Sequence, residues 1–404
     1  MKRLGLFGAI LLSVIIAFYM QPVLFPPKLE VKKSSEQITQ NQMTTWKYQK
    51  LETSGFSTYV GQSVDELEQR FGDPYERLTS GFGFEARYYH DQINHLSFEA
   101  NITKDKVSTI KVLNTDNSTI APFYLGMTMQ DLTEITTIYT NFNFQYNGTD
   151  VGIELMEEDM NYRPLIAFDN DTFAILFFDQ SSNGLFSIVY LDKASLLKLH
   201  PYQVFGSDLP QYKIDDQVDW AEINQAKEGH SVRLLNQLRQ LDRLPLYKQT
   251  TGFSTQTKLL LSDYLNRPED ILTKERLAEW QQIAGSTNAT AKFSLTTDEI
   301  DSLVAKRKLP HSTGVFTHPV IDPTFTFLFL YSDPYYHDRF LVNTSDLLGI
   351  AFSKENMLVL MQEEVKESTD SSDNQRGIIC LRRSMSELIR LYQKKRDDEK
   401  IFKS

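Results

Sequence analysis

The chain has 404 residues, a net charge of −11, 12% aromatic side chains and a single cysteine. One hydrophobic core rarely grows past about 250–300 residues, so this length predicts two domains with linkers. The acidic balance argues against a nucleic-acid partner. The lone cysteine excludes an internal disulfide framework, which fits a bacterial envelope better than an animal extracellular space.

The chain begins with an apolar segment. Lys2 and Arg3 precede residues 4–27, which carry no charge, and no small-x-small cleavage site follows. About 20 apolar residues are enough to cross a bilayer. We therefore expect residues 1–27 to be a single-pass signal-anchor in the cell membrane, with the bulk of the chain extracytoplasmic; a cleaved signal peptide is the alternative. Polar residues 28–54 are expected to be a spacer.

A sequence motif then occurs twice. In residues 59–67 and 124–132, a Tyr is followed by Gly and by a helix-start signal. Gly tolerates positive φ, Ser63 or Thr128 stands at the expected N-cap, and an acid follows three positions later as in a capping box. We expect residues 55–195 to form two similar units, each with one helix against a small antiparallel sheet. The strand-like runs are 84–89, 95–100, 107–113, 142–146, 151–155, 165–168, 174–178 and 185–190.

The pattern weakens after the repeats and then changes. Residues 196–228 contain two prolines and an acidic run, and we expect a linker there. Helical spacing of apolar residues resumes in residues 229–365, with strand-like runs at 347–352 and 357–361 near the end. Residues 366–404 are expected to be a polar linker and an amphipathic helix, which docks on the preceding domain or on a partner rather than on the membrane.

The repeat resembles a known domain. Tyr-x-Gly-x-Ser-x-x-Glu-Leu, a helix, Gly-Asp-Pro74 and aromatic strands resemble the CAP-associated N-terminal domain of Gram-positive bacteria, over residues 55–195. Such domains stand between a membrane anchor and a CAP domain, the superfamily of cysteine-rich secretory (SCP-like), antigen 5 and pathogenesis-related proteins. A similar helix start in small outer-membrane assembly lipoproteins is a second resemblance. The first implies an α+β fold with a membrane helix, repeated α/β units and a CAP-like α/β/α sandwich.

The second half resembles a CAP domain in outline. Residues 234–246 look like its opening helix, and residues 337–343 with 348–352 look like its His-Arg-x-x-Leu-x-Asn element and the strand that follows. The resemblance implies a cleft where two His and acidic residues converge. Leu295 stands in place of the first His and Val315 in place of an acid. The resemblance therefore predicts a degenerate cleft.

The remaining candidate cleft residues are His337, which persists at the second His position, Asp338 in place of the usual Arg, and the nearby His311 and His318. One imidazole does not make a tight metal site, so no metal or other cofactor is expected. A displaced His/Asp site is the alternative. Because the spacings match no compact ligand motif, loop histidines with local hydrogen bonds are the preferred interpretation.

No motif identifies a reaction. The sequence has no Gly-x-Ser-x-Gly elbow or Gly-rich phosphate loop, and Cys380 lies between apolar residues, as a small apolar side chain would. We assign no catalytic residue and expect a membrane-anchored, extracytoplasmic protein of the cell envelope that binds a protein, peptide or wall component and no nucleic acid. The alternative is a metal-dependent hydrolase or metal-binding protein that uses a rearranged CAP cleft.

Overall fold

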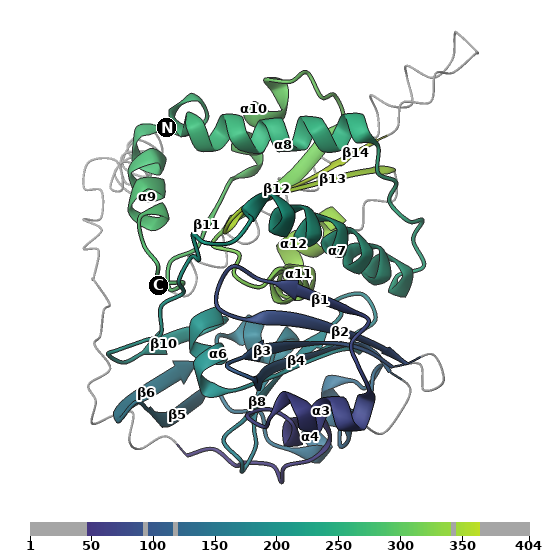
Figure 1. The fold of residues 1–404 in the computed structure, drawn as a ribbon, viewed down its shortest axis with the longest axis vertical. Helices are drawn as coiled ribbons and strands as arrows, with labels where there is room; N and C mark the ends of the chain where they lie inside the picture. Colours follow the sequence, from purple (N-terminus) through teal and green to yellow (C-terminus); the bar gives the residue numbers. More distant parts are fainter. Residues whose placement is uncertain (1–46, 92–95, 116–119, 341–344, 364–404) are drawn as a thin grey trace, which may run out of the picture.

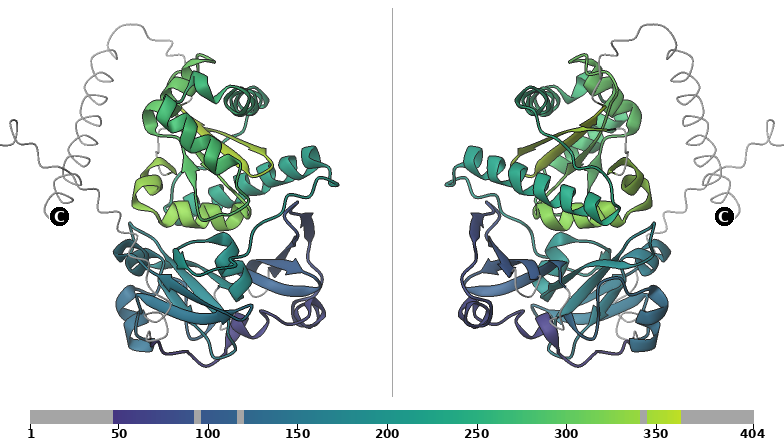
Figure 2. Two further views of the ribbon diagram at one scale, coloured as in Figure 1. Left: turned by 90° about the vertical axis from the view of Figure 1, so that its left-hand side faces the viewer. Right: turned by 90° about the vertical axis from the view of Figure 1, so that its right-hand side faces the viewer.

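The computed structural model describes residues 47–363, apart from 92–95, 116–119 and 341–344. The predicted anchor, most of the predicted spacer and the predicted terminal helix with Cys380 lie outside the described residues. Within the described part of the chain, no helix is both long enough and apolar enough to cross a bilayer. The chain forms two stacked halves, with helices α7 (Trp220–Leu241) and α11 (Pro323–Ser332) lying between their sheets (Figure 1, Figure 2).

The N-terminal half contains short helices and antiparallel strands. Its elements are η1 (Gly55–Thr58), α3 (Val64–Phe71), β1 (Glu76–Thr79), β2 (Glu85–Asp91), β3 (Leu96–Thr103), β4 (Lys106–Asn114), α4 (Met129–Ile135), β5 (Asn141–Tyr146), β6 (Thr149–Glu154), α5 (Glu157–Tyr162), β7 (Leu165–Ala167), β8 (Phe173–Phe178), β9 (Leu185–Leu191), α6 (Lys193–Leu199) and β10 (Gln203–Phe205). Each of the eight predicted strand-like runs corresponds to one of the strands β2 to β9.

The two repeats share one sheet. Its order is β1-β2-β3-β4-β9-β8-β7, and β4 of the first repeat pairs antiparallel with β9 of the second. The prediction of a separate small sheet for each unit is therefore wrong, because the hydrogen-bonding edge of β4 is completed by β9. The second repeat also carries the hairpin β5–β6, which forms a three-stranded sheet with β10.

Equivalent backbone contacts relate the two repeats. Gly61 N donates to Val107 O at 2.7 Å, and Gly126 N donates to Leu185 O, also at 2.7 Å. Both glycines have positive φ, +87° and +85°, which an L side chain rarely adopts. The repeated Gly in the sequence thus marks the same turn, from which each helix starts beside a strand.

The hydroxyl residues cap both helices. Ser63 Oγ accepts a hydrogen bond from Asp65 N at 3.2 Å at the start of α3. Thr128 Oγ1 accepts from Asp131 N at 3.3 Å, and the Asp131 carboxylate accepts from Thr128 N at 2.7 Å, which completes a capping box on α4. The predicted N-caps are confirmed in both repeats, and the reciprocal box is formed in the second.

Replacing Ser63 or Thr128 with Ala should lower the free energy of unfolding by about 1 kcal/mol each, because a backbone N–H in the first turn loses the side-chain oxygen that accepts its hydrogen bond. Urea denaturation of the purified chain measures this loss. Thr133→Ala on the exposed side of α4 is the control, since Thr133 is not a cap, and its effect should stay within about 0.5 kcal/mol. Equal losses at Thr128 and Thr133 would contradict the capping role.

The C-terminal half is a sheet between two helical layers. Its elements are α7, α8 (Thr251–Asn266), η3 (Pro268–Asp270), α9 (Lys274–Ala284), β11 (Phe293–Ser294), α10 (Thr297–Ala305), β12 (Ser312–His318), α11, α12 (Pro334–Phe340), β13 (Leu347–Ser353) and β14 (Asn356–Gln362). The sheet order is β11-β12-β14-β13, with every pair antiparallel.

Both faces of this sheet are buried. Along β14, Met357 and Val359 pack into the cluster that includes α7 and α11, whereas Leu358 and Leu360 pack into the cluster with α8 and α10. Alternate residues of a strand point to opposite faces, so a strand that is apolar throughout requires cover on both sides. The result is an α/β/α sandwich, within a mixed α/β chain.

The segment predicted as a linker, residues 196–228, contains ordered elements. It includes the end of α6 and all of β10, and α7 starts at Trp220, ahead of the predicted domain start at residue 229. Asp219 caps α7 by accepting from Ala221 N at 2.9 Å. Near its start, α7 buries Lys227 over the ring of Phe82 and His230 beside Glu99 of the N-terminal half, so the sequence shows no apolar periodicity there.

Candidate functional site

A groove of about 530 Å³ lies between the two halves. The N-terminal half contributes the end of β4, the turn before α4 and the β8–β9 turn, and the C-terminal half contributes the last turns of α7 and residues of α11. Its walls are mainly apolar, formed by Leu113, Leu125, Leu185, Phe186, Leu234, Leu238, Leu241, Leu328 and Tyr331. This volume is in the range of small-ligand sites.

The polar groups of the groove are amides, hydroxyls and two carboxylates. Gln237 and Gln240 project from α7, Ser182 lies in the β8–β9 turn, and the acids are Asp179 and Asp242. Among the described residues that line the groove there is no Lys or Arg. Burial, and then the charge of Asp179, raise the pKa of Asp242, while His337 and Arg239 act in the opposite direction. The groove therefore favours neutral or cationic groups.

His337 is the predicted cleft residue that reaches this region. It is 2% exposed on α12, and its Nδ1 lies 2.7 Å from the carbonyl oxygen of Tyr331. Its Nε2 lies 3.4 Å from Asp179 Oδ1. A carboxylate oxygen of Asp242 lies within 4.8 Å of the ligand atoms of both His337 and Asp179. The structure thus joins His337 to two carboxylates that were not predicted as its partners.

The other predicted cleft residues lie elsewhere. His318 is buried at the end of β12, with its Nδ1 2.9 Å from Asn356 Oδ1, and burial lowers its pKa to about 4 despite hydrogen bonds that act oppositely. His311 is exposed and precedes the same strand, so the two histidines lie roughly 20 Å apart along it. Asp338 is exposed on α12. His311, His318 and Asp338 therefore do not share one site, and His318 is a core histidine hydrogen-bonded to Asn356.

The two positions at which the resemblance predicts lost cleft residues, Leu295 and Val315, lie in hydrophobic clusters. Leu295 is 4% exposed and Val315 is 1% exposed, each within an apolar cluster. Arg339 Nη1 donates to Gly314 O at 3.0 Å, and its guanidinium stacks on the ring of Tyr335 at 4.4 Å. Buried alkyl groups offer no lone pair to a cation.

Asp179 and Asp242 carry no distinctive signal in the sequence. Asp179 follows β8, and a strand end that enters a turn is the ordinary interpretation of such an Asp. Asp242 is the C-cap of α7. Only the packing of the β8–β9 turn against α11 and α12 brings them together, for example through Gln180 Nε2, which donates to Ser332 O at 2.8 Å.

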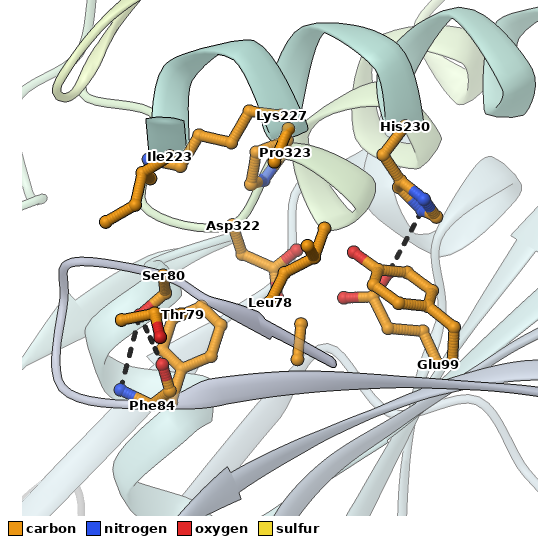
Figure 3. Close-up of a pocket in the computed structure, with 13 residues that line it drawn as sticks. Leu78, Thr79, Ser80, Phe84, Glu99, Ile223, Lys227, His230, Asp322 and Pro323 are labelled. Carbon is orange, nitrogen blue, oxygen red and sulfur yellow. Dashed lines mark hydrogen bonds and ion pairs between the residues drawn. The ribbon is translucent and has the colours of Figure 1, made fainter. Parts of the chain in front are cut away.

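A second contact region between the halves is a small cavity of about 30 Å³ under α7 (Figure 3). His230 reaches from α7 toward Glu99 of β3, with 3.6 Å between Nε2 and Oε2. Lys111 of β4 is fully buried, 2.6 Å from Glu99 Oε1 and 2.6 Å from Asp322 Oδ2. Asp322 also caps α11 by accepting from Phe325 N at 2.9 Å. This network joins the halves but leaves room for little more than a water molecule.

Apolar contacts also join the halves, at the groove wall and beside it. The rings of Phe186 and Tyr331 lie 5.2 Å apart, and those of Phe177 and Phe325 lie 6.1 Å apart. These residues belong to one hydrophobic cluster that runs through both halves. The groove is therefore bounded by a continuous core on one side, so its walls hold a defined spacing.

Comparison with known proteins gives matches to both halves. The family model described as CAP-associated N-terminal matches residues 60–202. An uncharacterized membrane protein of Bacillus subtilis, YlbC, is 24% identical over 214 residues, which is 53% of this chain and 61% of that protein. The match thus spans less than two thirds of the relative's length.

Two solved structures resemble the chain across both halves. One is an extracellular protein containing an SCP domain from Bacillus anthracis, with 15% identity and a TM-score of 0.58, covering 79% of this chain and 99% of that one. The other is a cysteine-rich secretory protein from Staphylococcus aureus, with 16% identity and a TM-score of 0.58, covering 78% of this chain and 98% of that one. Residues 60–202 thus match the CAP-associated N-terminal family model, and the two halves together have the fold of the two SCP-type proteins.

Proposed function

We propose that this protein is an extracytoplasmic component of the cell envelope, anchored by its N-terminal segment, that binds an extended peptide in the groove between its halves. The peptide belongs to an envelope protein or to the wall. The groove itself is the observation that supports this function most directly. Its apolar walls suit side chains, and the amides of Gln237 and Gln240 suit a peptide backbone.

The location is supported by the relatives and by the sequence. One similar protein is a membrane protein and one similar structure is an extracellular protein. The uncharged segment of residues 4–27 is long enough to span a bilayer. The proposed order is therefore an anchor, a spacer, the CAP-associated domain and a CAP-like domain, which holds the groove outside the membrane.

Binding without catalysis is supported by the CAP cleft positions. Leu295 and Val315 are buried hydrocarbon, and Arg339 and Tyr335 pack over the neighbouring surface. The alternative, a metal-dependent hydrolase, has one observation in its favour, the placement of His337 beside Asp179 and Asp242. Assays of wall and peptide hydrolysis with added Zn²⁺ distinguish the two, since the binding proposal expects no product.

Replacing Gln237 and Gln240 together with Lys should weaken the binding of a basic peptide about tenfold or more, because positive charge enters a groove whose charged groups are two acids. The double replacement with Glu should retain or increase binding. Fluorescence anisotropy with basic, neutral and acidic peptides of equal length measures this, and sedimentation with purified cell wall tests the wall-borne ligand.

Gln281→Lys on the exposed surface of α9 is the matched control and should leave affinity unchanged. The proposal fails if wild-type protein binds neither peptides nor wall material. It also fails if the Lys and Glu variants bind the basic peptide equally well.

A further inference from the structure

Three side chains from separate parts of the fold converge beside the groove. Asp179 lies in the turn after β8, Asp242 at the end of α7 and His337 in α12. One ligand atom of each lies within 4.8 Å of the other two. One of the three comes from the CAP-associated domain and the other two from the CAP-like half.

The hydrogen bonding of His337 leaves one nitrogen free to coordinate. Its Nδ1 lies 2.7 Å from the carbonyl oxygen of Tyr331, and a carbonyl only accepts, so Nδ1 carries the hydrogen. In the neutral ring, the lone pair is then on Nε2, which faces Asp179. Metal-binding histidines commonly donate their other N–H to a backbone carbonyl in this way.

Asp179 has one oxygen bound and one free. Its Oδ2 accepts from the backbone N and the hydroxyl of Ser182, each at 2.6 Å. Its Oδ1 accepts no hydrogen bond within the described part of the chain, although the residue is only 6% exposed. A buried carboxylate oxygen without a donor is costly, and it is directed at His337.

The spacing of the two groups suits an ion between them. His337 Nε2 and Asp179 Oδ1 are 3.4 Å apart, whereas a charge-assisted N–H···O bond is about 2.7–2.9 Å. Two ligands at about 2.1 Å from a tetrahedral Zn²⁺ are about 3.4 Å apart. Ser181 Oγ is also 3.4 Å from Nε2, a weak contact that a metal would replace.

Tyr331 orients the other two ligands. Its hydroxyl donates to Asp242 Oδ2 while its carbonyl accepts from His337 Nδ1. One residue of α11 therefore fixes both a carboxylate and an imidazole. Such supporting contacts are typical of metal sites, where they hold the ligands in position before the ion arrives.

From this geometry we propose that Asp179, Asp242 and His337 bind one divalent transition-metal ion of the Zn²⁺ class, with a remaining coordination position open to the groove. One imidazole and two carboxylates are a ligand set that Zn²⁺ accepts, whereas Ca²⁺ and Mg²⁺ prefer oxygen alone. The site does not use the positions of Leu295 and Val315, and it does not depend on the peptide-binding proposal. The ion ties the CAP-associated domain to the CAP-like half.

Titration of the chelator-treated full-length chain with Zn²⁺ tests the site. Calorimetry should give one ion per chain, and Asp179→Asn and His337→Gln should each lower affinity at least about tenfold. Co²⁺ should give the visible absorption of a four-coordinate site with nitrogen and oxygen ligands. The control variants, Asp338→Asn on the exposed side of α12 and His311→Gln, should bind as wild type.

Thermal unfolding separates loss of the site from loss of the fold. In chelator, variants that keep the wild-type unfolding temperature are folded, and Zn²⁺ should then raise the unfolding temperature of the wild type only. Asp242→Asn, at a half-buried position, is the third variant in case another does not fold. The proposal is overturned if the wild type binds no stoichiometric Zn²⁺, or if binding survives all of the folded ligand variants.

Discussion

Replacing Lys111 with Met should lower the free energy of unfolding by about 3–5 kcal/mol. Lys111 is fully buried between Glu99 and Asp322, at 2.6 Å from each, and it donates to Asn101 Oδ1 at 2.9 Å. Met keeps most of the side-chain volume but leaves two carboxylates buried without their cation. Since Glu99 and Asp322 come from different halves, the loss also weakens the contact between the halves.

The pH dependence of unfolding checks the same network. Burial alone would raise the pKa of Glu99, but Lys111 and His230 outweigh it and lower the pKa to about 2. Because the folded-state pKa is below the unfolded-state pKa of about 4.3, ionised Glu99 stabilises the fold at pH values above about 4.3. This stabilisation is lost as the pH falls toward 2. Wild-type stability should therefore fall over this acid range, and the decline should be smaller in Lys111→Met.

The pKa of Lys111 is shifted upward, in the opposite direction to that of Glu99, and it affects stability at high pH. Burial lowers its pKa, but Asp322 and Glu99 raise it further, so the net pKa lies above the ordinary lysine value of 10.5. The stability that protonated Lys111 contributes is fully present below pH 10.5, and it is lost only as the pH rises through the folded-state pKa. The protein should keep this stabilisation across neutral pH.

Lys50→Met provides the control for the loss of a lysine. Lys50 pairs with Asp171 at 2.7 Å, but the two side chains are 38% and 56% exposed. Such a surface pair contributes about 0–1 kcal/mol. If Lys111→Met costs no more than Lys50→Met in urea denaturation, the buried network does not hold the halves together.

Replacing Gly349 with Ala should lower the free energy of unfolding by about 1–3 kcal/mol. A Cβ on Gly349 of β13 would lie 2.1 Å from Thr257 Oγ1 and 3.0 Å from Thr257 Cβ. Thr257 is fully buried on α8, and its hydroxyl donates to Phe253 O at 2.9 Å. The new methyl must break this bond or push α8 away from the sheet.

A matched replacement and a rescue test this close approach. Gly229 lies inside α7, and a Cβ added there would meet no atom within 4 Å apart from the backbone of its own helix, so Gly229→Ala should stabilise the chain by about 0.5–1 kcal/mol. Adding Thr257→Ala to Gly349→Ala should recover part of the loss, with a coupling of about 0.5–3 kcal/mol. Additive effects of the two replacements would show that the helix and strand do not touch there.

The elements of the fold were predictable where the signal is local. The capping residues Ser63 and Thr128, and the positive-φ glycines Gly61 and Gly126, act within one turn of chain, so the sequence locates both repeats. The predicted runs 347–352 and 357–361 of β13 and β14 contain no polar side chain, and a run of this kind is typical of a strand covered on both faces. The resemblance to the CAP-associated domain rests on the same local features.

The candidate site could be predicted only in part. The resemblance pointed to His337, but His311, His318 and Asp338 do not join it, because β12 separates the first two and α12 turns the last outward. The partners of His337 are Asp179 and Asp242, whose positions at the end of a strand and of a helix are common for Asp and carry no sign of shared chemistry.

The sequence by itself determined the local elements and the repeat, because caps, turns and side-chain periodicity depend on neighbours along the chain. Only the tertiary structure decided that β4 and β9 join the repeats into one sheet, and that α7 and α11 cover the face of that sheet on which Lys111 lies. Glu99 and Lys111 alternate with apolar residues as on a solvated strand face, yet they are buried. Their burial, and the grouping of Asp179, Asp242 and His337, depend on contacts between residues distant in sequence, which no local pattern encodes.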